Sequence, residues 1–300
     1  MRMTSDPPPA AGRLAVAPYF DDLLDRLAAG DPDTRAAFGR HVHWGYWPDP
    51  DRAAGTADDY AAAAERLCRL VCDAAGVADG MRVLDVGCGF GGTIASLNER
   101  FAGLDLVGVN IDPRQLDRAR AEVRPANGNR VRFVHGDACR LDVPPASFDV
   151  VLAVECVFHF DSRARFFDGA ARALRPGGRL ALSDFVPPRA TLAELERHDP
   201  GADEATRVTY GRVDVLCPVE RYHELAGRAG LELAAARDIT AGTLPTYDFL
   251  QGDLRARPDR QAARVYSRAT SRLEAACRLG LLTYSILSFM RRADAAARPA

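Results

Sequence analysis

Val83-Leu84-Asp85-Val86-Gly87-Cys88-Gly89-Phe90-Gly91-Gly92-Thr93 is the stretch of this chain that decides its fold. An apolar run that begins at Met81 leads into it, and Ile94, Leu97 and Phe101 follow at helical spacing. The pattern predicts a strand, a glycine loop and a helix. Glycines leave the backbone bare for a ligand and accept the positive φ that such turns often need.

Two cofactors are bound by a strand–loop–helix unit of this kind. Gly87-x-Gly89-x-x-Gly92 matches the dinucleotide fingerprint, and Asp112 follows about 20 residues on, as that fingerprint requires. The alternative is a loop for S-adenosylmethionine (SAM), in which Asp85 stands two residues before the first glycine. The glycines alone do not separate the two cofactors.

Strand and helix patterns alternate along the rest of the chain, which predicts an α/β fold. The stretch 147–154 is continuously apolar, as expected of a central strand in a parallel sheet. The other predicted strands are 104–110, 131–134, 179–185, 231–239 and 282–289, and the predicted helices are 14–29, 57–75, 113–123, 163–174, 220–229 and 273–281.

Polar residues stand where several of the predicted strands end. Open α/β sheets bind ligands at the carboxyl ends of their strands. Glu155 and His159 follow the central strand directly, so they are the leading acid/base candidates, although a structural Glu and a packed His are the alternatives. Asp137 follows the third strand and Asp184 the fifth; Asp137 could also simply cap its turn.

From Leu84 to Phe185 the motifs together resemble the class I SAM-dependent methyltransferases. The resemblance rests on Leu84-Asp85-Val86-Gly87-Cys88-Gly89-x-Gly91, on Gly136-Asp137-Ala138 and on Leu174-Arg175-Pro176-Gly177-Gly178 before a strand. It implies a doubly wound, mostly parallel, seven-stranded Rossmann-like sheet with a reversed C-terminal hairpin, and SAM as the cofactor.

The same resemblance implies a set of cofactor-binding residues. Asp137 matches the acid that accepts a bond from the adenine amino group, and Asn110 stands where the family usually has a ribose-binding acid. The implied set is Asp85, Gly87, Cys88, Gly89, Gly91, Asn110, Ile111, Gln115, Asp137, Ala138 and Glu155.

An aromatic stretch, 41–48, precedes this core and is similar to the His-x-Gly-Tyr-Trp stretch of natural-product, sterol and tocopherol methyltransferases. It predicts a lid over a small-molecule pocket, formed by His43, Trp44, Tyr46 and Trp47; a segment that only packs on the core is the alternative. The predicted organisation is a disordered 1–13, a lid region 14–56, and a methyltransferase domain 57–300 with cap helices in about 189–215 and 241–280.

The reaction remains open between two forms of methyl transfer. His159 and Asp184 match the positions proposed as the acid/base pair in sugar O-methyltransferases similar to the rebeccamycin enzyme, whereas Glu155 matches the base of prenyl-diphosphate C-methyltransferases. We expect transfer to a hydroxyl of a secondary-metabolite-like small molecule. The alternatives are C-methylation of a prenyl, sterol or quinone-type substrate, a SAM-binding pericyclase, and an NAD-dependent oxidoreductase.

Composition narrows the class of protein further. With 39 basic and 41 acidic residues the formal net charge is −2, so no global basic field points to nucleic acid. No apolar run approaches the ~20 residues that span a bilayer. The seven cysteines lack Cys-x-x-Cys spacing and no metal-ligand cluster stands out, so we expect a reduced, cytoplasmic enzyme without a metal unless its substrate is a diphosphate. A monomer and a homodimer are both compatible with the sequence.

Overall fold

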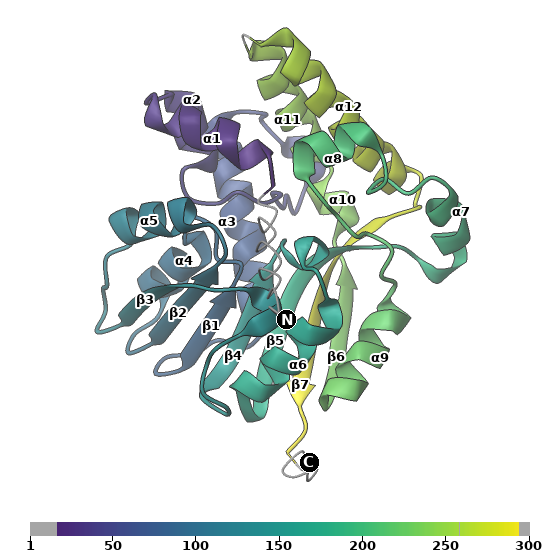
Figure 1. Ribbon diagram of the computed structural model, residues 1–300. Helices are drawn as coiled ribbons and strands as arrows, with labels where there is room; N and C mark the ends of the chain where they lie inside the picture. Colours follow the sequence, from purple (N-terminus) through teal and green to yellow (C-terminus); the bar gives the residue numbers. More distant parts are fainter. Residues whose placement is uncertain (1–16, 258, 294–300) are drawn as a thin grey trace, which may run out of the picture.

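The fold is built around a seven-stranded sheet with the strand order β3-β2-β1-β4-β5-β7-β6 (Figure 1). The computed structural model describes residues 17–257 and 259–293, so the predicted disorder of 1–13 lies outside the described residues. The strands are β1 Arg82–Val86, β2 Asp105–Asn110, β3 Arg130–His135, β4 Phe148–Val154, β5 Leu174–Val186, β6 Leu231–Asp238 and β7 Thr283–Arg291.

Strands β1 to β5 run parallel, and β7 lies antiparallel between β5 and β6. The predicted doubly wound sheet with a reversed C-terminal hairpin is therefore confirmed. β5 begins earlier than predicted because Leu174 already pairs with Phe148, before the Pro-Gly-Gly turn, and a register shift separates this pair from the rest of the ladder.

Helices cover both faces of the sheet. α3 and α4 pack on one face and α6 and α9 on the other, whereas α1, α2, α8 and α10–α12 gather beyond the carboxyl ends of the parallel strands (Figure 1). The helices are α1 Tyr19–Ala28, α2 Pro32–Phe38, α3 Ala57–Ala74, α4 Gly92–Arg100, α5 Pro113–Glu122, α6 Arg163–Ala173, α7 Leu192–Arg197, α8 Glu204–Tyr210, α9 Val219–Ala229, α10 Thr240–Thr243, α11 Pro245–Ala256 and α12 Arg260–Arg278.

The short helix α2 was not predicted, although its sequence carries a start signal. The Asp31 carboxylate accepts bonds from the backbone N–H groups of Asp33 and Thr34, both at 3.1 Å, and Pro32 occupies the first turn. Seven residues are too few for a clear apolar period, so the signal is visible only in the cap.

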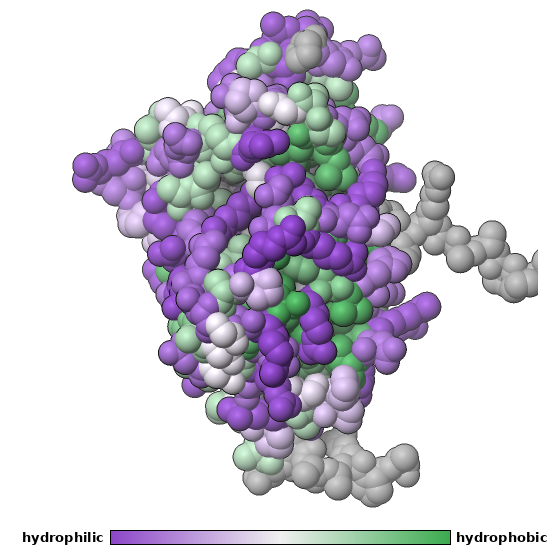
Figure 2. Space-filling model, turned by 90° about the vertical axis from the view of Figure 1, so that its left-hand side faces the viewer, coloured by the Kyte–Doolittle hydropathy of each residue, from purple (hydrophilic) through white to green (hydrophobic). Residues whose placement is uncertain are grey.

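Polar side chains lie mainly on the surface and large apolar side chains mainly in the interior. Seen from the side on which β3 lies, the surface is largely hydrophilic, with hydrophobic residues in separate patches (Figure 2). Among the described helices, none combines the length and apolar composition that crossing a membrane requires.

Trp44 and Trp47 are buried in the core, so the segment between α2 and α3 is packed against the domain.

Candidate active site

The glycine loop joins β1 to α4 with a run of left-handed backbone. Gly87, Gly89 and Gly91 have φ values of +77°, +53° and +80°. A Cβ on Gly87 would lie 2.7 Å from the Cys156 Sγ, whereas one on Gly89 would meet nothing nearer than a Gln115 oxygen at 3.8 Å. The loop backbone at Gly89 therefore faces open space, as a loop that cradles a ligand must.

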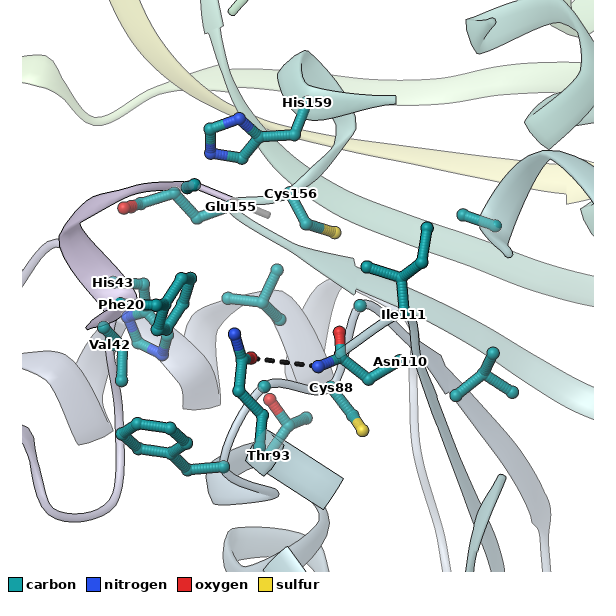
Figure 3. A pocket seen from close by; sticks show the side chains of 18 of the residues that line it. Phe20, Val42, His43, Cys88, Thr93, Asn110, Ile111, Glu155, Cys156 and His159 are labelled. Atoms are coloured by element: carbon teal, nitrogen blue, oxygen red, sulfur yellow. Dashed lines mark hydrogen bonds between the residues drawn. The ribbon is translucent and has the colours of Figure 1, made fainter. Parts of the chain in front are cut away.

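A cavity opens over this loop, and most of the predicted cofactor residues line it (Figure 3). Of the eleven positions implied by the resemblance, nine lie in its wall: Gly87, Cys88, Gly89, Asn110, Ile111, Gln115, Asp137, Ala138 and Glu155. We call this space the cofactor cavity. Most of these nine residues stand at or just after the carboxyl ends of β1, β2, β3 and β4, where an open α/β sheet binds its ligand.

Asn110 and Asp112 lie in different surroundings: Asn110 is in the cofactor cavity and Asp112 is at the start of α5. Asn110 ends β2 inside the cofactor cavity and donates from Nδ2 to the Gln115 Oε1 at 2.9 Å (Figure 3). Asp112 caps α5 instead, accepting from the Arg114 backbone N–H at 2.9 Å, and is 1% exposed. The acid that a dinucleotide fingerprint requires is therefore not presented to the cavity.

Asp137 has both features that its position predicts. Its Oδ1 accepts a bond from the Cys139 backbone N–H at 2.8 Å, so it caps the turn after β3. The same side chain is partly exposed and lines the cofactor cavity. One oxygen can hold the turn while the other stays available to a bound adenine amino group.

Asp85 and Gly91 do not line the cofactor cavity. Asp85 is 1% exposed, its Oδ2 has no hydrogen-bond partner, and burial raises its pKa to about 7. Gly91 is the residue before α4, and a Cβ there would lie 3.0 Å from the Phe133 ring. Asp85 thus lies in β1 before the loop, and Gly91 ends the loop against Phe133, on the side away from the cavity.

A second cavity lies beside the first and is mostly apolar. Tyr19, Val42, Glu155 and His159 line both spaces and so mark the place where they meet. We call this second space the acceptor cavity. Its further walls are aromatic or aliphatic side chains from α1, α8, α11 and α12 and from the segments around them, including Leu23, Trp44, Phe158, Phe185, Tyr210, Leu250 and Leu273.

Glu155 is held in a strained conformation at this junction. Its φ is +51°, a left-handed value that is uncommon for a residue with a side chain. Its Oε2 accepts from the Trp44 backbone N–H at 2.9 Å and from the Tyr284 hydroxyl. Burial raises the pKa of Glu155 to about 8.

One ring nitrogen of His159 forms a hydrogen bond, and the other has no hydrogen-bond partner among the described residues. Its Nδ1 lies 3.1 Å from the Arg212 carbonyl oxygen, and because a carbonyl can only accept, Nδ1 carries the proton. The neutral ring then has its lone pair on Nε2. Burial lowers the pKa of His159 to about 4, so the ring is neutral at pH 7.

Asp184 lies outside both cavities, in contrast to Glu155 and His159. It is fully buried at the end of β5, where it accepts from the Arg163 Nη2 at 3.2 Å, from the Phe185 backbone N–H at 2.7 Å and from the Tyr222 hydroxyl. These bonds occupy the carboxylate, so the structure makes Asp184 the partner of a buried arginine.

The four aromatic or histidine side chains predicted to form a lid separate into two pairs. His43 lines the cofactor cavity and Trp44 the acceptor cavity. Tyr46 and Trp47 line neither: Trp47 donates from Nε1 to Asp59 at 2.9 Å, and a Cβ on Gly242 would clash with the Tyr46 ring. Sequence reasoning did not select several wall residues: Tyr19, Phe20 and Arg40 belong to no motif, whereas His41 and Thr93 stand at the ends of the two quoted motifs and Cys156 follows Glu155.

Over residues 17–257 and 259–293, no three His, Cys, Asp or Glu side chains gather in a way that could hold a metal ion. The two cavities instead offer backbone, amide, carboxyl and imidazole groups around a glycine loop. This arrangement fits an adenosine-containing cofactor on one side and an apolar molecule on the other, with Glu155 and His159 between them.

Comparison with known proteins assigns the chain to a family. Residues 84–182 match the model described as a methyltransferase domain. The chain is 36% identical to the methyltransferase GfsG of Streptomyces halstedii over 237 residues, and this aligned region covers 77% of each chain. It is 35% identical over 237 residues to the 27-O-demethylrifamycin SV methyltransferase of Amycolatopsis mediterranei (strain S699), which covers 76% of each.

The solved structures agree on the fold. The mycolic acid cyclopropane synthase CmaA1, complexed with SAH and CTAB, superimposes with a TM-score of 0.72 at 18% identity, over 92% of this chain and 99% of that one. Three findings indicate the same family: the sheet order, the glycine loop that faces the cavity, and two relatives more than one-third identical to this chain. The chain belongs to the SAM-dependent methyltransferases.

Proposed function

We propose that this methyltransferase transfers the methyl group of SAM to a hydroxyl of a mostly apolar small molecule, with His159 as the base. The observation that carries the proposal is the free Nε2 of His159, which belongs to a side chain that lines both cavities. Bound SAM supplies a methyl group already activated on a sulfonium. The chain has to align the acceptor, exclude water and accept a proton.

A hydroxyl nucleophile loses its proton as the methyl group arrives, and a positioned base is worth about 10²–10⁴ in rate. His159 is neutral at pH 7 because burial lowers its pKa to about 4. Its Nδ1–H is fixed by the Arg212 carbonyl, so the ring cannot turn its lone pair away without losing that bond. His159 is thus suited to accept the proton of an alcohol.

The acceptor cavity supports a large, weakly polar substrate. Its walls are mainly aromatic and aliphatic, and the charged side chains Asp253 and Arg257 in it already pair with each other. Of the two relatives at about 35% identity, one is named as the methyltransferase of 27-O-demethylrifamycin SV. We infer an acceptor of similar chemistry, a polyoxygenated but largely apolar secondary metabolite with one reacting hydroxyl.

Carbon methylation is a second candidate, because Glu155 stands at the same junction. Carbon methylation requires a base only after the methyl group has arrived, and a carboxylate can also stabilise the positive charge that forms. A 29% identical relative is a sterol 24-C-methyltransferase of Pneumocystis carinii. Glu155 already accepts two hydrogen bonds on one oxygen, so its other oxygen is the one available to a substrate.

The experiment is a mass-spectrometric screen of demethylated natural products with SAM and the purified full chain. A product 14 Da heavier, formed in equal amount to S-adenosylhomocysteine, supports the proposal. The NMR spectrum of that product then distinguishes O- from C-methylation, because only O-methylation removes the signal of the reacting hydroxyl. Product formation without S-adenosylhomocysteine would instead identify a SAM-binding pericyclase and overturn the proposal.

We place this small-molecule reaction in a reducing compartment such as the cytoplasm. All seven cysteines are buried free thiols, and oxidising compartments favour disulfides. Light scattering of the purified chain would decide between the monomer and the homodimer that the sequence leaves open.

A further inference from the structure

Three polar side chains form a hydrogen-bonded row that begins in the wall of the cofactor cavity. The His43 Nε2 lies 3.1 Å from the His41 Nδ1, and the His41 Nε2 lies 2.8 Å from the Glu65 Oε2 on α3. At its other end, the His43 Nδ1 lies 2.9 Å from the Trp44 carbonyl oxygen. His41 and His43 are 4% and 8% exposed, so their ring nitrogens depend mainly on these contacts for hydrogen-bond partners.

The protons of this row can be counted from its two ends. The Trp44 carbonyl only accepts, so His43 carries a proton on Nδ1. Burial lowers the pKa of His43 to about 3, so the ring is neutral and its Nε2 must accept. The His41 Nδ1 is therefore a donor.

The other end of the row also requires a donor from His41. Two groups donate to the Glu65 carboxylate, the Ser96 hydroxyl at 2.6 Å and the Arg69 Nε at 2.8 Å, and the Arg40 Nη2 lies 3.4 Å away as an ion-pair partner. These bonds and the one to His41 hold the pKa of Glu65 well below its usual range, so it is ionised. An ionised carboxylate only accepts, which makes the His41 Nε2 a donor as well.

We propose that Glu65 holds His41 as an imidazolium, and that the row of hydrogen bonds anchored on Glu65 positions His43 and Trp44 at the two cavities. The charged and titratable groups around His41 are Glu65, Arg40, Glu99 and His43. Burial, with Arg40, lowers the pKa of His41 below its ordinary value although Glu65 and Glu99 act to raise it. The hydrogen-bond count along the row is therefore the observation that places the second proton on His41. A neutral His41 would leave two acceptors facing each other at 2.8 or 3.1 Å without water, which costs a buried unsatisfied group.

The row ends at the reaction junction. His43 binds the Trp44 carbonyl, and the Trp44 backbone N–H donates to the Glu155 Oε2 at 2.9 Å. The Trp44 ring lines the acceptor cavity and packs edge-on against Phe185, with the ring centroids 5.7 Å apart. Glu65 is thus a positioning residue for the wall of the acceptor cavity and for the Glu155 carboxyl; this part of the inference rests on the proposed function.

The test reads the protonation of His41 directly, by ¹⁵N NMR of the full chain labelled at histidine, without SAM, at pH 7.5. We expect both ring nitrogens of His41 to be protonated and only Nδ1 of His43. In Glu65→Gln, the amide can donate to the His41 Nε2, so His41 should become a neutral ring protonated on Nδ1 while the row keeps its geometry. A singly protonated His41 in the unaltered chain, or one unaffected by Glu65→Gln, would overturn the proposal.

The positioning role has its own readouts. Glu65→Leu removes the acceptor, so we expect the Trp44 indole signal to shift and broaden and kcat to fall about tenfold, whereas Glu65→Gln restores both to near their starting values. Glu99→Gln is the matched control, because Glu99 also accepts from Arg40 but does not contact His41. An unmoved Trp44 signal in Glu65→Leu would refute the positioning role. The NMR results need no acceptor, so they stand or fall separately from the proposed hydroxyl substrate.

Discussion

The Trp44 backbone N–H donates to the Glu155 carboxyl at 2.9 Å, across 111 positions of the chain. This bond joins the segment before α3 to the strained end of the central strand β4. Because the two residues also line the acceptor cavity, the segment before α3 forms part of the wall of that cavity. The roles of the site residues can be separated by single substitutions.

The first prediction concerns the base. His159→Ala should lower kcat by about 10²–10⁴ while the dissociation constant for SAM stays within a few-fold, because the base acts on the acceptor. Glu155→Gln should cost less if oxygen is methylated. The measurement is kcat for both variants, with calorimetry for SAM, and the exposed His223→Ala serves as the control. A larger loss in Glu155→Gln would favour carbon methylation.

The second prediction concerns the acid side of the pH profile. A base must be unprotonated, and burial lowers the pKa of His159 from the ordinary 6.5 to about 4. The fraction of neutral His159 is therefore near one from pH 7 down to about pH 5 and falls only as the pH passes 4. We expect kcat to stay flat between pH 7 and 5. A loss of half the activity near pH 6.5 would show that the ring titrates as in water and contradict this account.

The third prediction concerns adenine binding. Asp137→Ala should weaken SAM binding about tenfold or more, since a hydrogen bond to a charged group is worth about 1.5–3 kcal/mol. Asp137→Asn keeps an oxygen that can cap the Cys139 N–H and so separates the loss of charge from the loss of the turn. Calorimetry on both variants measures the effect. Unchanged SAM affinity in Asp137→Ala would remove Asp137 from the cofactor site.

Much of this architecture could be predicted from the sequence, because its signals are local. The glycine loop, the apolar β4 and the alternation of strand and helix gave the sheet, and Glu155 and His159 stand at a strand end where ligands bind. Asp184 stands at the end of the neighbouring strand in the same way. Its partner Arg163 comes from α6, and no spacing rule reveals that pairing.

The rest depends on contacts between distant segments. The aromatic residues of 41–48 predict a lid over a pocket, but they do not reveal that Trp44 and Trp47 are buried in the core or that the Tyr60 hydroxyl on α3 donates to the His43 carbonyl at 3.0 Å. The periodicity of α3 marks its apolar face but not which segment packs on it. In the same way, the role of Tyr19 as a wall of both cavities has no signature in the sequence.

The fourth prediction concerns a proton released on SAM binding. Burial raises the pKa of Glu155 to about 8, so most of the free protein carries a proton there at pH 7. Glu155 lines the cofactor cavity, and a bound cation favours the ionised form of a nearby carboxyl. SAM binding should therefore release up to one proton at pH 7 and strengthen as the pH rises towards 8. Calorimetry in buffers of different ionisation enthalpy measures it, and an equal release in Glu155→Gln would refute the assignment.

The last prediction concerns how α1 docks on the cap. The Asp253 carboxylate of α11 accepts from Arg26 of α1 at 3.0 and 3.2 Å and from the Arg257 Nε at 3.0 Å. Arg257 also donates to Asp22 of α1 at 2.6 Å, so one acidic side chain holds two arginines at the wall of the acceptor cavity. These side chains are only partly exposed, so solvent screens their pairing incompletely.

Removing that charge should loosen α1 selectively. Asp253→Asn leaves two arginines without their shared partner, so we expect faster amide hydrogen exchange in α1 and a free energy of unfolding lower by about 1.5–3 kcal/mol, the range for hydrogen bonds to charged groups. Exchange in α4, on the face of the sheet, should stay unchanged. Asp33→Asn on α2 is the control, because Asp33 forms no ion pair within the part of the chain that the structure describes. The acceptor KM should rise several-fold while the SAM dissociation constant changes less, because Asp253 lines only the acceptor cavity. Equal protection of α1 in both variants would mean that apolar packing, and not this ion pair, holds the helix over the acceptor.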